Sequence, residues 1–387
     1  MRILQIPSPP RAMKLKPKLG IADHFQDVVD PRIDRSKDHL LIDILTIASL
    51  AVICGADGWV GIETYGKAKH QWLKTFLILP NGIPSHDTFS RVFARLDPEQ
   101  LQGCFVSWVR SVSRVSDGEV IAIDGKTVRR SYDAGKEKGA IHMVSAWASQ
   151  NRLVLGQHKV DDKSNEITAI PELLKVLELY GCIVTIDAMG TQKTIAGQIV
   201  DQGGDYVLAL KGNQGNLFED VQQILEQAKS QNFEGIDHDF YEICDAGHGR
   251  MEIRRCWSLG QVEGLIDAQK WRGFTSIAMV ESLRQCEGKT SREQRYYISS
   301  LTPDAQRLAE SIRTHWSIEN PLHWVLDVAF REDECRIRTG HAPENFTLLR
   351  HLALSALNQE TTAKIGVKNK RLRAGWDDDY LLKVLAG

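Results

Sequence analysis

Two apolar stretches in the middle of the sequence each end in an aspartate. Residues 120–123 (VIAI) precede Asp124, and residues 182–186 (CIVTI) precede Asp187. A carboxylate at the end of a strand is poorly placed for packing. It is well placed to bind a hard cation, because Mg²⁺ takes one or two carboxylates and keeps waters for the substrate. The pair therefore predicts a metal-dependent site.

Each aspartate also has a purely structural interpretation. Asp124 and Gly125 could form a type I′ hairpin turn, which Asp-Gly pairs favour. The residues that follow, 126–130 (KTVRR), do not mirror a paired strand, so the sequence favours the metal role for Asp124. Asp187 could instead cap the helix expected from about Thr191. There too we favour the metal role.

A third acid is expected on a late helical segment. Here Ile312, His315, Glu319, His323 and Leu326 recur at three- and four-residue intervals and therefore share one face of a helix. A glutamate with a histidine one turn away on each side indicates surroundings other than plain solvent. Rival carboxylates follow on the same segment, at Asp327, Glu332, Asp333 and Glu334.

The same segment leaves two further points open. Pro321 would remove one helix hydrogen bond and kink the helix, or it would mark the start of a new helix. Zinc binding by His315, Glu319 and His323 is disfavoured, because the H-E-x-x-H spacing of metalloproteases is absent.

Length and composition indicate a soluble protein of several units. A chain of 387 residues is long enough for two or three domains, each with its own core. No apolar run reaches the ~20 residues of a membrane helix, and the N-terminus does not resemble a secretory signal. Seven cysteines without a C-x-x-C pair are expected to be reduced thiols. We therefore expect a cytoplasmic protein that contacts no membrane.

The net charge of -2 gives no overall attraction to nucleic acid, so DNA binding would depend on local basic patches. Two acid-free basic stretches occur, in residues 1–20 and in residues 364–373. A third candidate is the helix predicted over 85–96, where Arg91 and Arg95 are four residues apart. It could be the recognition helix of a helix-turn-helix or an ordinary packing helix, and the sequence slightly favours packing.

Changes in periodicity predict the organisation of the chain. Helical patterns dominate up to about residue 115, whereas period-two strands begin at residue 119. Three strands, a crossover helix, a strand, a helix and a fifth strand then follow, which is the order of ribonuclease-H-like domains, an α/β class with a mixed sheet. The predicted units are a flexible basic arm (1–20), a helical N-terminal domain that binds DNA ends (21–116), the first part of the catalytic core (117–213), a strand-rich insertion (214–300) and a helical C-terminal part (301–387).

Six motifs in order carry a resemblance to a known family. The chain strongly resembles the H-repeat-associated group of bacterial insertion-sequence transposases over nearly its whole length. The motifs are IDGK at 123–126, SNEI at 164–167, IDAMGTQ at 186–192, LKGNQ at 210–214, HGR at 248–250 and HWSIEN at 315–320.

The resemblance implies a DDE transposase with a ribonuclease-H-like core and the catalytic, metal-binding triad Asp124, Asp187 and Glu319. The 132 positions between Asp187 and Glu319 leave room for the insertion. Three such carboxylates are suited to two Mg²⁺ ions, with Mn²⁺ as a substitute, in phosphodiester chemistry. The expected reaction is cleavage at the ends of the protein's own element and transfer of 3′ ends to target DNA.

The expected partner is double-stranded DNA, both element ends and target, bound by a homodimer in the bacterial nucleoid. Lys126, Lys211 and Arg250 would supply positive charge to phosphates. Related transposases carry Tyr, Arg, Glu and Lys on the final helix, but of these only the glutamate is kept here. His315, Arg313 or His323 would then take over the DNA contacts.

Two other functions are compatible with the sequence. The protein could be a catalytically silent derivative that only binds DNA ends, although the intact acids argue against it. It could also be a host nuclease of the same fold without strand transfer. Inverted repeats that flank the gene would favour the transposase over the nuclease.

Overall fold

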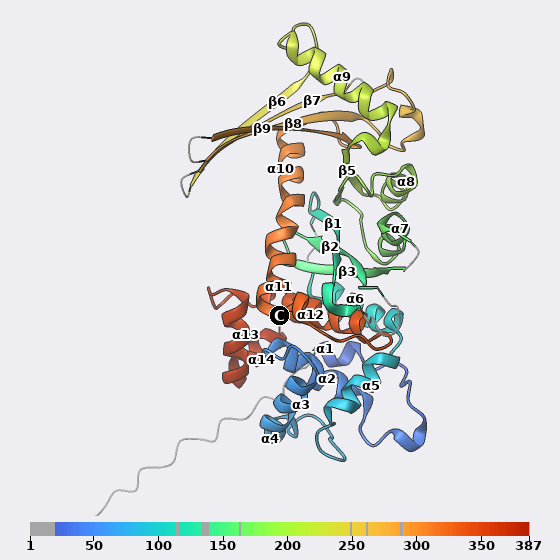
Figure 1. The fold of residues 1–387 in the computed structure, drawn as a ribbon, viewed down its shortest axis with the longest axis vertical. Helices are drawn as coiled ribbons and strands as arrows, with labels where there is room; N and C mark the ends of the chain where they lie inside the picture. The colour runs from blue at the N-terminus through green and yellow to red at the C-terminus, as the bar shows by residue number, and fades with distance from the viewer. Residues whose placement is uncertain are drawn as a thin grey trace, which may run out of the picture.

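One nine-stranded mixed sheet forms the centre of the protein, with helices on its two faces and a group of helices at one end (Figure 1). The structure is a computed structural model that describes residues 20–113, 116–132, 139–161, 164–247, 250–260, 262–286 and 289–386. The arm expected at residues 1–20 lies outside the described residues except for Gly20, and so do His248 and Gly249.

The strand order is β3-β2-β1-β4-β5-β9-β8-β7-β6. Strands β1, β4 and β5 are parallel to one another, and every other neighbouring pair is antiparallel. Because β9 pairs with β5, the strand-rich segment extends the central sheet and forms no sheet of its own. The strands are β1 Val120–Thr127, β2 His142–Ala148, β3 Leu153–Val160, β4 Ile183–Ile186, β5 Asp205–Leu210, β6 Asp239–Gly247, β7 Arg250–Leu259, β8 Ser276–Cys286 and β9 Lys289–Ser299.

The middle strands are covered on both faces, which explains why their sequences are continuous apolar runs. On one face, Val120, Ile183 and Val207 pack against Leu308 and Ile312 of α10. Helices α7 and α8 lie on the other face (Figure 1). Asp124 lies within β1 and Asp187 directly follows β4, each where the apolar part of its strand stops.

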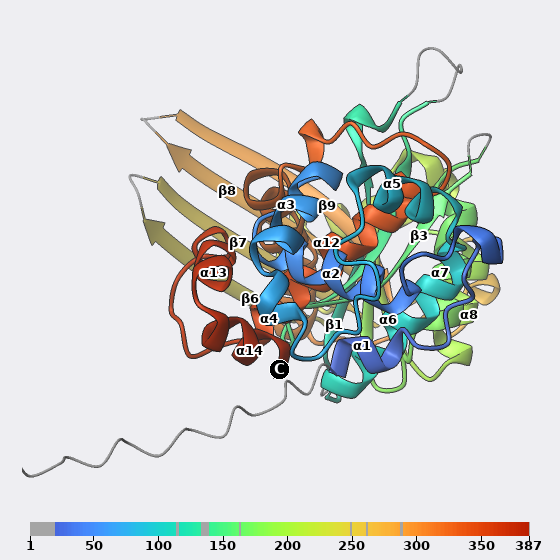
Figure 2. The same cartoon turned by 90° about the horizontal axis from the view of Figure 1, so that it is seen from below.

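The N-terminal helices share a core with a helix from the C-terminal part of the chain. Helix α12 packs on α2, α5, α6 and strand β3, and Figure 2 shows it among the N-terminal helices. Asn345 of α12 donates hydrogen bonds to the carbonyl oxygens of Phe93 and Leu96. Nearly every residue of α2 and α12 is buried, as expected for helices surrounded by protein.

The described helices are α1 Gly20–His24, α2 Leu41–Ile53, α3 Trp59–Ala68, α4 His70–Leu73, α5 His86–Arg95, α6 Pro98–Val112, α7 Glu166–Val176, α8 Lys193–Asp201, α9 Asn216–Ser230, α10 Ala305–Trp316, α11 Val325–Phe330, α12 Ala342–Gln359, α13 Val367–Trp376 and α14 Asp378–Ala386. Among the described residues, none of these helices has the length and apolar content needed to cross a lipid bilayer.

The late helical segment is interrupted, whereas the sequence pattern predicted one helix through residue 328. Helix α10 ends at Trp316, a 3₁₀ turn covers Ser317–Glu319, a π-helical turn covers Asn320–Trp324, and α11 follows. Pro321 explains the interruption, because it has no backbone N–H to donate. Of the two alternatives for Pro321, the structure shows the start of a new helical turn, with Pro321 in the first turn of Asn320–Trp324, and the uninterrupted helix is wrong.

Candidate active site

Asp124 and Asp187 occupy equivalent places on neighbouring parallel strands. The parallel pairing of β1 with β4 ends at Ile123 and Ile186, which are register partners. Each aspartate is the next residue, and adjacent strands lie about 4.8 Å apart. The two carboxylates predicted from separate apolar runs therefore emerge side by side at one end of the sheet.

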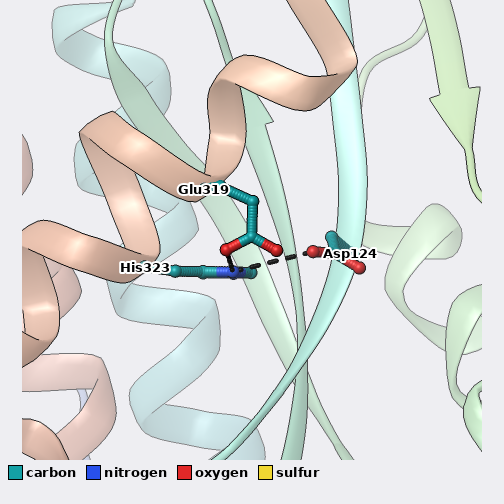
Figure 3. Close-up of side chains that lie close together, drawn as sticks. All are labelled: Asp124, Glu319 and His323. Carbon is teal, nitrogen blue, oxygen red and sulfur yellow. Dashed lines mark ion pairs between the residues drawn. The ribbon is translucent and has the colours of Figure 1, made fainter. Parts of the chain in front are cut away.

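Glu319 and His323 approach Asp124 from the interrupted helical segment. The Nδ1 atom of His323 is 3.6 Å from Oδ2 of Asp124 and 3.5 Å from Oε2 of Glu319 (Figure 3). One donor atom from each of the three residues lies within 4.8 Å of the other two. The side chain of Glu319 is 60% exposed, whereas that of His323 is only 7% exposed. The cluster therefore opens to solvent on the Glu319 side.

The carboxyl group of Asp124 lies in surroundings that disfavour its charge. Burial raises its pKa to about 7, and the negative charges of Glu166, Glu319 and Asp187 add to the effect, while the backbone N–H of Gly125 partly opposes it. A divalent cation between these carboxylates would remove both the burial penalty and the repulsion. The site has the electrostatics of a cation-binding site.

This pKa predicts how the stability of the metal-free protein depends on pH. Between pH 3.8 and about 7 the folded state holds a proton on Asp124 that the unfolded chain has released, so stability falls as pH rises. Asp124→Asn carries no charge and should gain stability relative to the wild type over this window, by roughly 2–4 kcal/mol between pH 4 and pH 8. Urea unfolding of both proteins in EDTA at the two pH values measures this, and an equal difference at both would contradict the shift.

Asp187 also organises the turn that leads into α8. Its Oδ1 accepts hydrogen bonds from the backbone N–H groups of Met189 and Gly190, at 3.0 and 3.2 Å. The capping alternative is wrong, because α8 begins at Lys193 with Gln192 at its N-cap, and Asp187 stabilises only the preceding turn. Asp187 is not in the three-residue cluster found among the described residues, but its charge raises the pKa of Asp124.

His315 lies deeper than the other members of the predicted helix face. Its Nδ1 is 3.1 Å from the hydroxyl of Thr185, and burial lowers its pKa to about 4, so the imidazole is neutral at pH 7. His315, Asp187 and Lys211 line a cavity of about 220 Å³. In the same cavity the guanidinium of Arg295 stacks on the ring of Trp316, with 4.1 Å between them.

Comparison with known proteins gives the family. Residues 115–356 match the model of the transposase DDE domain, and residues 22–109 match the model described as DDE_Tnp_1-associated. The first match alone spans more than half of the chain. The chain belongs to the DDE transposase family.

Relatives of this transposase come from Escherichia coli. The chain is 43% identical over 372 residues to "H repeat-associated putative transposase YhhI" of strain K12, which covers 95% of this chain and 98% of YhhI. It is 42% identical over 371 residues to "Putative transposase YncI" of O157:H7, over 95% of this chain and 94% of YncI. The resemblance seen in the sequence motifs is confirmed.

Among solved structures, the synaptic complex of piggyBac transposase with hairpin DNA aligns over 93% of this transposase and 75% of that chain. The TM-score is 0.42 and the sequence identity is 11%, which is too distant to support an argument.

The DDE transposase family generally uses divalent metal ions, and the residues here fit such an ion. Two carboxylates and an imidazole are common ligands of divalent metals. Burial and the neighbouring acids disfavour the charge of Asp124, and a bound cation would offset both effects. This donor set supports metal binding without identifying the ion.

Lys126 of the transposase, predicted to contact DNA, lies in a group of carboxylates. Its Nζ is 2.6 Å from Asp327, 2.9 Å from Glu332 and 3.5 Å from Asp333. These are three of the four rival acids from the sequence, so the structure pairs them with Lys126 and not with Asp124, and the fourth, Glu334, pairs with Arg331. A phosphate contact by Lys126 stays a prediction, and it would compete with these ion pairs.

The other predicted DNA contacts lie on the surface or outside the described side chains. Lys211 is exposed at the end of β5. Arg91 and Arg95 are exposed on α5, whose Phe89, Val92 and Phe93 are buried, an arrangement that fits a packing helix and a recognition helix equally. Arg250 begins β7, but its side chain is not among those described. The DNA roles of these four residues stay predictions.

The sequence did not indicate that His142 and Glu166 form a hydrogen-bonded pair next to Gly125. Glu166, expected only as a helix-start acid, does begin α7, but it also accepts a 2.6 Å hydrogen bond from Nε2 of His142. The Nδ1 of His142 is 2.8 Å from the hydroxyl of Thr127. A side chain at Gly125 would overlap both Glu166 and His142 in their present positions and would therefore displace this pair. The SNEI motif at 164–167 was the available signal.

Proposed function

We propose that this protein is an active DDE transposase that cleaves DNA at the ends of its own insertion element and transfers the 3′ ends to target DNA. The observation that carries the proposal is the approach of Glu319 to Asp124, across 195 positions of sequence, beside the strand end that bears Asp187. A silent derivative would have no use for a glutamate held against Asp124 from so distant a segment.

The architecture supports a ribonuclease-H-like assignment for the catalytic core. Strands β3, β2, β1, β4 and β5 are adjacent in that order, with the first three antiparallel and the last three parallel. Helices cover both faces. Asp124 lies within β1, Asp187 directly follows β4, and Glu319 follows α10. Along the chain, β1, β2, β3, α7, β4, α8 and β5 follow in the order that the sequence predicted.

Asp124, Asp187 and Glu319 are the proposed catalytic and metal-binding residues. Mg²⁺ is the expected ion and Mn²⁺ a substitute. When two such ions are bound, they activate the attacking oxygen and stabilise the leaving oxygen of an in-line displacement. Asp124 is proposed to serve both positions, since Glu319 approaches it on one side and Asp187 follows the neighbouring strand on the other.

Double-stranded DNA is the proposed partner, both as element end and as target. Lys211 and Arg295 beside Asp187 would attract a phosphodiester to the cavity, while Arg91 and Arg95 offer positive charge on the N-terminal helices. Because transposition joins two ends, we propose a homodimer on DNA, acting in the bacterial cytoplasm at the nucleoid.

The test uses purified protein and a plasmid that carries its gene with several hundred flanking base pairs. We expect nicks and excision at the gene's borders with Mg²⁺ or Mn²⁺ and none with EDTA. Border binding without cuts would support the silent derivative. Metal-dependent cuts scattered away from the borders would support a host nuclease instead.

A further inference from the structure

His323 is the buried member of the cluster that contains Asp124 and Glu319. It lies in the π-helical turn Asn320–Trp324 and is 5% exposed. Its Nδ1 points at both carboxylates (Figure 3), at 3.6 and 3.5 Å. These separations are too long for good hydrogen bonds, which need about 2.7–3.2 Å. His323 therefore faces two acids without bonding firmly to either.

The same separations suit ligands that share one ion. Two neighbouring donor atoms each about 2.1 Å from an octahedral ion are about 3.0 Å apart. The nitrogen and the two carboxylate oxygens all lie within 4.8 Å of one another. An ion among them would satisfy Nδ1 and both acids with only small movements.

The imidazole is held in place by burial and not by firm hydrogen bonds. The Nε2 atom is buried and has no hydrogen-bond partner among the described residues, and Nδ1 faces the two acids only at 3.5 and 3.6 Å. A buried polar atom without a firm partner is costly, and an ion bound at Nδ1 would give that atom one.

We propose that His323 is a metal ligand, so that the ion shared by Asp124 and Glu319 occupies a mixed oxygen–nitrogen site. This inference rests on the proposed function, which places a second, oxygen-ligated position between Asp124 and Asp187. The two metal positions then differ in chemistry. Imidazole binds borderline ions such as Mn²⁺ and Zn²⁺ more readily than Mg²⁺, so the His323 position prefers Mn²⁺ over Mg²⁺.

The probe is Mn²⁺ added to the full-length protein without DNA, observed by pulsed electron paramagnetic resonance for coupling to a nitrogen nucleus. We expect the wild type to show nitrogen coupling and His323→Gln to lose it. Because even outer partners of metal ligands change affinity by roughly 10–100-fold, Mn²⁺ affinity in His323→Gln should fall at least about tenfold.

Two variants serve as controls. His315→Gln removes the neighbouring buried histidine, whose Nδ1 lies by Thr185 and not in the cluster, and should keep the nitrogen coupling. Asp187→Asn should also keep it, because Asp187 belongs to the other position.

The outcomes separate this inference from the proposed function. Mn²⁺ bound by wild-type protein without nitrogen coupling would overturn the role of His323 and leave the acidic site intact. Coupling that persists in His323→Gln and vanishes in His315→Gln would overturn it as well. Failure of the wild type to bind Mn²⁺ would overturn both. If His323→Gln does not fold, the wild-type spectrum and His323→Asn still decide the question.

Discussion

Asp124→Asn is expected to abolish metal-dependent DNA cutting while DNA binding persists. Asp124 is the acid that both proposed metal positions share, and an amide there cannot neutralise a cation. Metal ions supply several kcal/mol of transition-state stabilisation in phosphoryl chemistry. At about 1.4 kcal/mol per factor of ten, the loss of cutting rate should exceed about 10³-fold. Cleavage at the gene's borders in the plasmid measures the loss of cutting, and a gel-shift assay measures DNA binding.

A matched control is available at the end of another strand. Asp161 is an aspartate that directly follows β3. Its side chain is exposed, and Asp161 is not in the cluster of Asp124, Glu319 and His323. Asp161→Asn should therefore cut at nearly the wild-type rate. If Asp124→Asn still cuts the borders, the assignment of the catalytic acids is wrong, whatever the family.

Lys126→Met should destabilise the protein by about 3 kcal/mol. Lys126 is mostly buried and contacts Asp327 and Glu332, and Glu332 is only 1% exposed. Burial alone would raise the pKa of Glu332, but the charges of Arg350 and Lys126 outweigh burial and lower it. Removal of one partner from a buried ion pair costs about 3–5 kcal/mol, because the remaining charge is uncompensated. Arg350 still contacts Glu332, which favours the lower value.

The comparison for this prediction is Lys193→Met. Lys193 pairs with Asp267 at 2.8 Å, and both side chains are more than a third exposed. Exposed pairs contribute less than about 1 kcal/mol, so this variant should shift the urea unfolding midpoint only slightly. Equal shifts for the two variants would show that the carboxylate group around Lys126 is not a stabilising element.

The parts of the fold that could be predicted from the sequence depend on local patterns. The segments before Asp124 and Asp187 are continuous apolar runs, because the strands that they form are buried on both faces. Their adjacency followed from the order of strands and helices, and Glu319 followed from the family motif together with the spacing. The sequence also indicated that Pro321 would interrupt the helix.

The rest depends on contacts between distant segments, which leave no local pattern. Lys126 meets Glu332 across 206 positions, so nothing near Lys126 distinguishes an ion-paired lysine from a DNA-binding one. His142 and Glu166 come from separate elements, and their meeting depends on the space that Gly125 leaves. His323 lies near Asp124 because it belongs to a π-helical turn. A repeat of apolar residues in the sequence does not distinguish such a turn from an α-helix.

Helix α12 also limits when the protein can become active during its synthesis. The N-terminal helices are made first, yet Asn345 completes their packing, and Arg371 donates to the carbonyl of Val52, 319 positions earlier. Contacts between such distant segments form late in folding. The two aspartates are therefore made long before Glu319 can join them. A chain still attached to the ribosome therefore cannot complete the proposed catalytic site until nearly all of it has emerged.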